Sequence, residues 1–118
     1  MTVIAWDGNT LAADKLATSG GGIARTVTKI WKHGEVLLAI TGGWDVAIEL
    51  REWYKAGAVP AAFPEKARED SATLLVFSRA AIETYNSGPY PMRIESNQHA
   101  AGTGRDYAEA VMFLGKSA

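Results

Sequence analysis

The sequence predicts an α+β fold in which antiparallel strands joined by hairpin turns are combined with two main helices. Three observations predict this class. Short runs of apolar and β-branched residues, separated by turn residues, fill most of the first half of the chain. Apolar residues recur at helical spacing over residues 44–56. A second helical segment, almost without a polar face, covers residues 105–114.

The first hairpin brings an acidic residue close to the start of the chain. A strand over residues 2–6 is predicted to turn at residues 7–10 and to return as a strand that ends at Asp14. Antiparallel pairing about this turn sets Thr2 opposite one of residues 13–15. We therefore expect Asp14 to lie beside Thr2.

A second hairpin is predicted after a loop. Residues 17–22 are too rich in glycine and other small residues to form regular structure, so we expect a loop there. A strand over residues 26–32 then turns at His33 and Gly34 and returns over residues 35–40. The returning strand is apolar on both faces, as a strand covered from both sides would be.

The helix over residues 44–56 starts directly after a glycine pair, Gly42 and Gly43, and Gly57 supplies its end. Proline and charged residues are frequent over residues 57–71, which indicates a solvated connector. The second helix is expected to be closed by a glycine as well. Because that helix is apolar on nearly all sides, it has to be covered from more than one direction.

The remaining strands form a third hairpin and a short final strand. Residues 73–77 are expected to pair with residues 82–85, and a short strand follows near residues 92–95. No internal repeat and no composition shift divides the chain. We therefore expect residues 1–118 to form one domain, either reduced in size or continued by further residues after position 118.

Composition excludes several classes of function. The chain is 47% hydrophobic and 21% charged, which is ordinary globular composition. Its net charge of −1 does not indicate the basic surface that binds nucleic acid or an anionic membrane. The absence of cysteine excludes disulfides, thiolate metal sites and cysteine nucleophiles. With only His33 and His99 as imidazoles, we expect no metal and no cofactor. No signal peptide or membrane-spanning run is evident, so a cytoplasmic location is expected.

Thr2 is the most informative single residue. Removal of Met1 would leave it as the amino terminus, and a terminal threonine carries a nucleophilic hydroxyl and a base on the same residue. The base is its own α-amine, whose ordinary pKa is ~7.7–8.0. Many proteins begin with Met and Thr without catalytic meaning, so the other residues decide whether Thr2 is a nucleophile.

Several segments, in this order, resemble the β-type subunit of proteasomes and, most closely, the bacterial HslV-type peptidase. The matching segments are Thr2-Val3-Ile4-Ala5, Ala12-Ala13-Asp14, Thr28-Lys29-Ile30-Trp31, Ala39-Ile40-Thr41-Gly42-Gly43 and Ala101-Gly102-Thr103-Gly104. The resemblance implies a sandwich of antiparallel sheets with helices, the N-terminal-nucleophile hydrolase fold. It also implies a reduced form of that fold, because residues 60–70 stand where the family has a second long helix.

The resemblance assigns a role to each candidate residue. Thr2 would be the nucleophile of an amide hydrolase that stays inactive while Met1 is retained, and Asp14 would orient Lys29. The positive charge of Lys29 would favour the neutral form of the Thr2 amine. Lys29 lies between two apolar neighbours on a predicted strand face, whereas the competing Lys15 and Lys32 are expected at the surface.

Other residues would support the reaction. Gly42 and Gly43 would offer backbone N–H groups to the oxyanion, and Thr103 would add a hydroxyl in place of the family's serine. Each has a purely structural alternative: Asp14 can bond a turn, the glycines can serve the turn alone, and Thr103 can cap a helix.

For the whole protein, the resemblance implies a homo-oligomeric ring that encloses peptide or unfolded-protein substrates, with an ATP-driven unfoldase as a partner. Two alternatives stay open. One is a non-catalytic assembly protein with a proteasome-like fold, and the other is an amidase that uses the same nucleophile on a small molecule.

Overall fold

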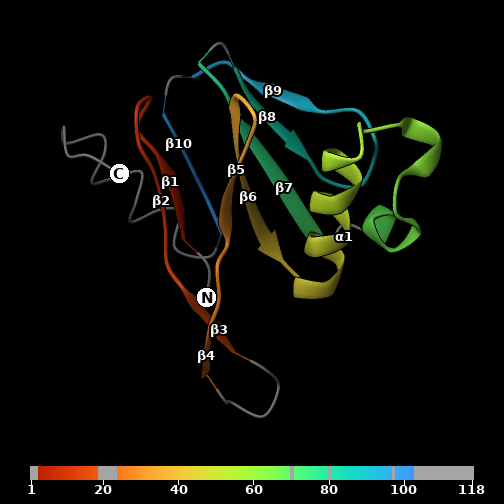
Figure 1. Ribbon diagram of the computed structural model, residues 1–118, viewed down its shortest axis with the longest axis horizontal. Coiled ribbons are helices and arrows are strands. Elements are labelled where there is room, and N and C mark those ends of the chain that lie inside the picture. The colour runs from red at the N-terminus through yellow and green to blue at the C-terminus, as the bar shows by residue number, and fades with distance from the viewer. Residues whose placement is uncertain (1–2, 19–23, 70, 80, 97, 103–118) are drawn as a thin grey trace. The chain divides into compact units, whose positions relative to one another are not determined.

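The computed structural model describes residues 3–18, 24–69, 71–79, 81–96 and 98–102, and it consists of two compact units (Figure 1). Unit 1 contains Met1–Ile30 and Ser96–Ala118, and unit 2 contains Trp31–Glu95. The strand ladders of both units are antiparallel, and one α-helix packs within unit 2. The predicted α+β class with antiparallel sheets is therefore confirmed.

Unit 1 holds a three-stranded sheet with β1 at its centre. The strands are β1 (Ile4–Trp6), β2 (Leu11–Ala13) and β10 (His99–Ala101), in the order β10-β1-β2. The predicted first hairpin is confirmed, and Asp7 fixes its turn by accepting the N–H groups of Asn9 and Thr10 at 2.9 and 2.8 Å. This Asx-type turn is a local interaction, which explains why the sequence predicts it.

A two-stranded ribbon, β3 (Leu16–Thr18) with β4 (Ala24–Thr26), corrects two predictions. Residues 17 and 18 belong to β3 and not to the expected loop. The single strand expected over residues 26–32 is divided between β4 and β5 (Ile30–His33), with residues 27–29 outside both. The division arises because the first part pairs with β3 whereas the second part pairs with β6.

Unit 2 is built on a five-stranded sheet in the order β5-β6-β7-β8-β9. After β5 come β6 (Val36–Gly42), β7 (Ala72–Phe77), β8 (Ile82–Tyr85) and β9 (Met92–Ile94). The second hairpin forms with a shorter first strand than predicted, and the third hairpin and the short strand near residues 92–95 form as predicted. Consecutive buried residues in β6 and β7 show that these strands are covered on both faces, as the apolar pattern of β6 indicates.

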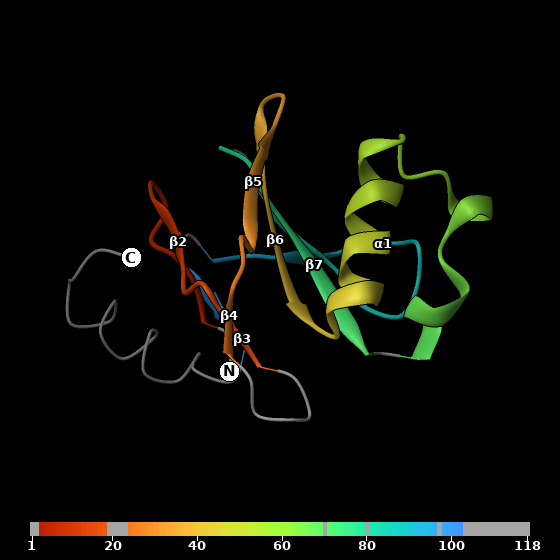
Figure 2. The same ribbon diagram turned by 60° about the horizontal axis from the view of Figure 1, so that its bottom comes forward.

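Helix α1 (Trp44–Lys55) lies along one face of this sheet against β6 and β7 (Figure 2). The contact buries Ala47, Leu50 and Trp53 of the helix. The helix was predicted to end before Gly57, and it does: Gly57 has a φ of 116° and donates its N–H to the Tyr54 carbonyl oxygen at 3.0 Å. Glycine adopts this left-handed conformation without the steric cost that a side chain would add.

The connector after the helix is not the solvated loop that its composition indicates. It contains two short 3-10 helices, η1 (Pro60–Ala62) and η2 (Glu65–Glu69), and it buries Phe63 and Ala67. The Phe63 ring packs edge-on against Trp53, with 5.0 Å between ring centroids. Two apolar residues spaced among charged ones are enough to anchor the segment, and the charged side chains stay outside.

Two further expectations concern the limits of the fold. The helix expected over residues 105–114 lies outside the described residues. Within the described part of the chain, no helix is both long enough and apolar enough to cross a membrane.

Candidate active site

Asp14 is fixed against the first strand by a pair of backbone contacts. The register Ile4↔Ala13, continued by one step, sets Asp14 opposite Val3. The Asp14 N–H donates to the Val3 carbonyl oxygen at 3.2 Å, and the Val3 N–H donates to the Asp14 carboxylate Oδ1 at 2.9 Å. Asp14 therefore lies beside the residue that follows Thr2. Thr2 itself is outside the described residues.

Lys29 forms an ion pair with Asp14. Its Nζ lies 3.0 Å from Oδ1 and 2.9 Å from Oδ2, so the ammonium group binds both carboxylate oxygens. The Lys29 side chain is 5% exposed and that of Asp14 is 29% exposed. The apolar neighbours of Lys29 predict that its side chain turns away from solvent, and its burial confirms this, although Lys29 lies between β4 and β5 and not within a strand.

The ribbon of β3 and β4 explains why these two residues meet. Its register Leu16↔Thr26 continues one step further, where the Val27 N–H donates to the Lys15 carbonyl oxygen at 2.9 Å. Another step along this register brings Asp14 and Thr28 to the same level, so Lys29 follows immediately. Strand pairing in the ribbon therefore brings the segment that carries Lys29 close to Asp14.

The competing lysines lie elsewhere. Lys15 is exposed and donates from Nζ to the Thr28 hydroxyl oxygen at 3.0 Å, and Lys32 is exposed on β5. Both are surface residues, as predicted.

The ion pair has a clear electrostatic consequence. A lysine is seldom buried without a partner, because an unpaired ammonium loses its hydration. Here the Asp14 carboxylate compensates that loss and is itself held by the Val3 N–H. The arrangement keeps a positive charge with N–H donors at a defined position near the start of β1. Such a group can stabilise a neighbouring amine in its neutral form or a developing negative charge.

Gly42 and Gly43 lie in unit 2, at the turn from β6 into α1, as predicted, but their two N–H groups differ. The Gly43 N–H donates to the Ser71 carbonyl oxygen at 2.8 Å, so it is already engaged. This bond makes the next pair, Gly42↔Ala72, a non-hydrogen-bonded pair of the ladder, and the Gly42 N–H points away from β7. Of the two glycines, Gly42 is the one whose N–H is directed away from this strand.

Gly42 also has a structural reason to be glycine. Its φ is +91°, and a Cβ built there would lie 2.5 Å from the Ser71 carbonyl oxygen and 2.7 Å from the Ala72 Cα. Gly43 has an ordinary φ of −61°, and its added Cβ would come no closer than 3.5 Å to Ser71. Backbone packing therefore accounts for Gly42 but not for Gly43.

The segment before Thr103 forms a strand that sequence reasoning missed. Strand β10 pairs with β1 in the register Ile4↔Ala101, and Gly102 follows with a φ of +87°. Thr103 lies outside the described residues. All three residues of β1 are apolar in the sequence and buried in the structure, as in a central strand with a neighbour on each side. This apolar run was the available sequence signal for a second partner of β1.

A metal site is not formed by the side chains that the structure describes. No three histidine, aspartate or glutamate side chains among them gather closely enough to hold an ion.

Comparison with solved structures identifies the fold. Thiobacillus denitrificans BPH in complex with epoxomicin is 18% identical, with a TM-score of 0.66, and the match covers 97% of this chain and 78% of that one. HslV from Trypanosoma brucei is 19% identical, with a TM-score of 0.68 and the same coverage. The Gly-1 mutant of Anbu from Hyphomicrobium sp. strain MC1 is 9% identical, with a TM-score of 0.61 over 96% of this chain and 64% of that one.

These similarities confirm, at the level of the fold, the resemblance inferred from the sequence. The chain shares its fold with these HslV-type structures and has one main helix in its described part. No protein-family profile and no curated protein sequence matches it.

Proposed function

We propose that this protein is an amide hydrolase of the N-terminal-nucleophile class, in which Thr2 acts after removal of Met1. One observation carries the proposal. The partly buried ion pair of Lys29 and Asp14 is bonded to the backbone N–H of Val3, the residue joined covalently to Thr2. Consecutive Cα atoms are ~3.8 Å apart, and this short covalent link between Val3 and Thr2 supports the proposal.

The reaction follows from this placement. The Thr2 hydroxyl oxygen attacks the amide carbonyl carbon while the Thr2 α-amine takes the hydroxyl proton. The tetrahedral intermediate then collapses, the C–N bond breaks, and the same amine returns the proton to the leaving nitrogen. Water attacks the resulting ester by the reverse proton transfers, which releases the acid and restores the threonine. Lys29 keeps the amine neutral through its charge, and Asp14 positions Lys29.

Strand pairing supports a contribution from Thr103. The register of β1 with β10 runs Trp6↔His99, Ala5↔Ala100 and Ile4↔Ala101. In the sequence, β1 begins two positions after Thr2, and β10 ends two positions before Thr103. The proposal therefore assigns Thr103 a hydroxyl that assists the Thr2 amine.

Gly42 is proposed as the N–H donor to the oxyanion, since the Gly43 N–H is engaged by Ser71. A peptide or an unfolded chain is the proposed substrate, and a homo-oligomeric ring is the proposed assembly, with an ATP-driven unfoldase as its partner. These three assignments are supported by the fold that the chain shares with HslV.

Covalent labelling tests the proposal. The chain should be produced from a fusion that is cleaved directly before Thr2, and then treated with a β-lactone or with epoxomicin, the compound bound in the Thiobacillus denitrificans complex. Intact-mass measurement should show one adduct. Thr2→Ser should retain part of this labelling, because the hydroxyl and the amine both remain. Thr2→Ala should show none.

Two outcomes would contradict the proposal. One is an adduct that persists in Thr2→Ala, because another residue would then be the nucleophile. The other is a folded protein that begins at Thr2 and is not labelled, which would favour the non-catalytic alternative.

A further inference from the structure

A cavity of about 510 Å³ lies between helix α1 and the segment that follows it in unit 2. Val59 and Ala62 line it from that segment. The helix contributes residues three and four positions apart, which share one side of an α-helix: Ile48, Glu49, Glu52, Trp53 and Ala56. The volume is within the ~300–1,000 Å³ range of pockets that bind small molecules. The cavity is therefore large enough for a small organic ligand.

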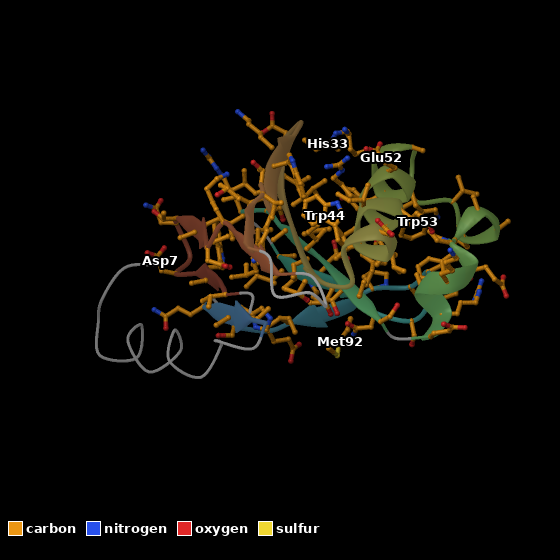
Figure 3. The ribbon with its side chains drawn as sticks, turned by 90° about the horizontal axis from the view of Figure 1, so that it is seen from below. Asp7, His33, Trp44, Glu52, Trp53 and Met92 are labelled. Carbon is orange, nitrogen blue, oxygen red and sulfur yellow. The ribbon has the colours of Figure 1, made fainter. Side chains whose placement is uncertain are left out.

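The apolar walls of this cavity are held in place by specific contacts. The indole N–H of Trp53, which Figure 3 shows on α1, donates to the Val59 carbonyl oxygen at 2.8 Å. The Ala58 N–H donates to the Trp53 carbonyl oxygen at 3.1 Å, so the segment turns back against the end of the helix. Val59 is nevertheless 52% exposed. The walls are fixed, and one of them is accessible from solvent.

The charge at the cavity is negative. Glu49 and Glu52 are the charged residues that line it. The basic residues of α1, Arg51 and Lys55, both act on Glu52, and the Arg51 Nη2 binds its Oε1 at 2.6 Å. Glu49 is exposed, and it forms no ion pair or side-chain hydrogen bond with the residues that the structure describes. Its carboxylate is therefore the group that can meet a charged ligand.

We propose that this cavity binds a small apolar cation of the arylalkylammonium class. The hydrocarbon body of the ligand lies against the apolar walls at Val59 and Ala62, which removes it from water. The ammonium group lies at the Glu49 carboxylate. In a pocket that is otherwise apolar, this one charged group determines both the orientation of the ligand and the sign of charge that it accepts.

Three compounds with the same skeleton test the proposal on the full chain at pH 7. They are 4-phenylbutylamine, which is a cation, 4-phenylbutanol, which is neutral, and 4-phenylbutyrate, which is an anion. Titrations are followed by the NMR signal of the Trp53 indole N–H, because this group belongs to the cavity wall. The amine should bind more tightly than the alcohol by up to ~5-fold, the scale of an exposed ion pair. The butyrate should bind more weakly than the alcohol.

Variants of exposed residues separate charge from shape. Glu49→Gln should bind the amine and the alcohol equally, and Glu49→Lys should prefer the butyrate to the amine. Glu95→Gln changes an exposed glutamate that does not line the cavity, so it should keep the preference of the wild type. Ala62→Trp fills the cavity and should abolish the change in the Trp53 signal with all three compounds. Ala56→Phe replaces it if Ala62→Trp does not fold.

Four results would overturn the proposal. The first is a wild type whose Trp53 signal does not respond to 4-phenylbutylamine at millimolar concentration. The second is equal affinity of the wild type for the amine and the alcohol. The third is a preference for the amine that persists in Glu49→Gln, and the fourth is binding that persists when the cavity is filled. Binding is measured without any reaction, on protein that retains Met1, so these results are independent of Thr2 chemistry.

Discussion

At the scale of single residues, the Asp14 carboxylate connects the backbone of β1 to a buried charge. Oδ1 accepts the N–H of Val3, and both oxygens bind the Lys29 ammonium. The position of Asp14 was predictable because a short turn determines the register of its hairpin. The burial of Lys29 was predictable from its apolar neighbours. The engagement of the Gly43 N–H by Ser71 was not predictable, because it depends on a strand almost thirty residues away.

The first prediction concerns the stability that the ion pair provides. Asp14→Asn should lower the free energy of unfolding by up to ~3–5 kcal/mol, because a buried ammonium would lose its carboxylate. Adding Lys29→Met should restore part of that loss, since the double variant buries no charge. Urea denaturation of the wild type, the two single variants and the double variant measures the interaction free energy between Asp14 and Lys29. Strictly additive effects would show that the two side chains do not depend on each other.

The second prediction concerns the role of Lys29 in the reaction. Lys29→Ala should slow covalent labelling of Thr2 by ~10²–10⁴-fold, the scale of lost acid–base assistance. Lys15→Ala changes a lysine that is exposed and bonded to Thr28, so its labelling rate should stay near that of the wild type. Equal rates in both variants would remove Lys29 from the mechanism.

At the scale of elements, the sequence predicts what local interactions decide. The turn of the first hairpin is set by the Asp7 carboxylate, which accepts a nearby backbone N–H, and the end of α1 is set by the left-handed conformation of Gly57. Both effects act over a few residues. Strand β10 was missed because it exists only through its pairing with β1, far away in the sequence. The division between β4 and β5 has the same origin, since each part pairs with a different strand.

The third prediction tests the packing of the turn between β6 and α1. Gly42→Ala should destabilise the protein by at least ~1–3 kcal/mol, because alanine at a positive φ is strained and its Cβ would contact the Ser71 and Ala72 backbone. Gly43→Ala should change stability by less than ~1 kcal/mol, since its backbone conformation suits alanine. Thermal unfolding compares the two variants. Equal destabilisation would contradict the described turn.

The fourth prediction concerns the interface between α1 and the sheet. Burial, and to a lesser degree the negative charge of Glu83, raises the pKa of Tyr85 above its ordinary value of 10.0. The folded protein thus retains this proton at a pH at which the unfolded chain has lost it. The contribution is complete below pH 10.0 and declines as the pH rises further. In Tyr85→Phe, the free energy of unfolding should decline less steeply above that pH. An unchanged slope in urea titrations would contradict this.

At the scale of the whole molecule, the fold and the proposed chemistry have different foundations. The fold is established by antiparallel pairing in both units and by its similarity to solved HslV-type structures. The chemistry depends on a few side chains in unit 1 and on the removal of Met1.

The most direct test of the central claim compares covalent labelling of two forms of the same chain. One form retains Met1, and the other begins at Thr2 with a free α-amine. If that amine is the base, the form without Met1 should react with the β-lactone faster by ~10²–10⁴-fold, with the adduct on its N-terminal peptide. Equal labelling rates in the two forms, with both folded, would contradict the assignment of Thr2 as a nucleophile activated by its own amine.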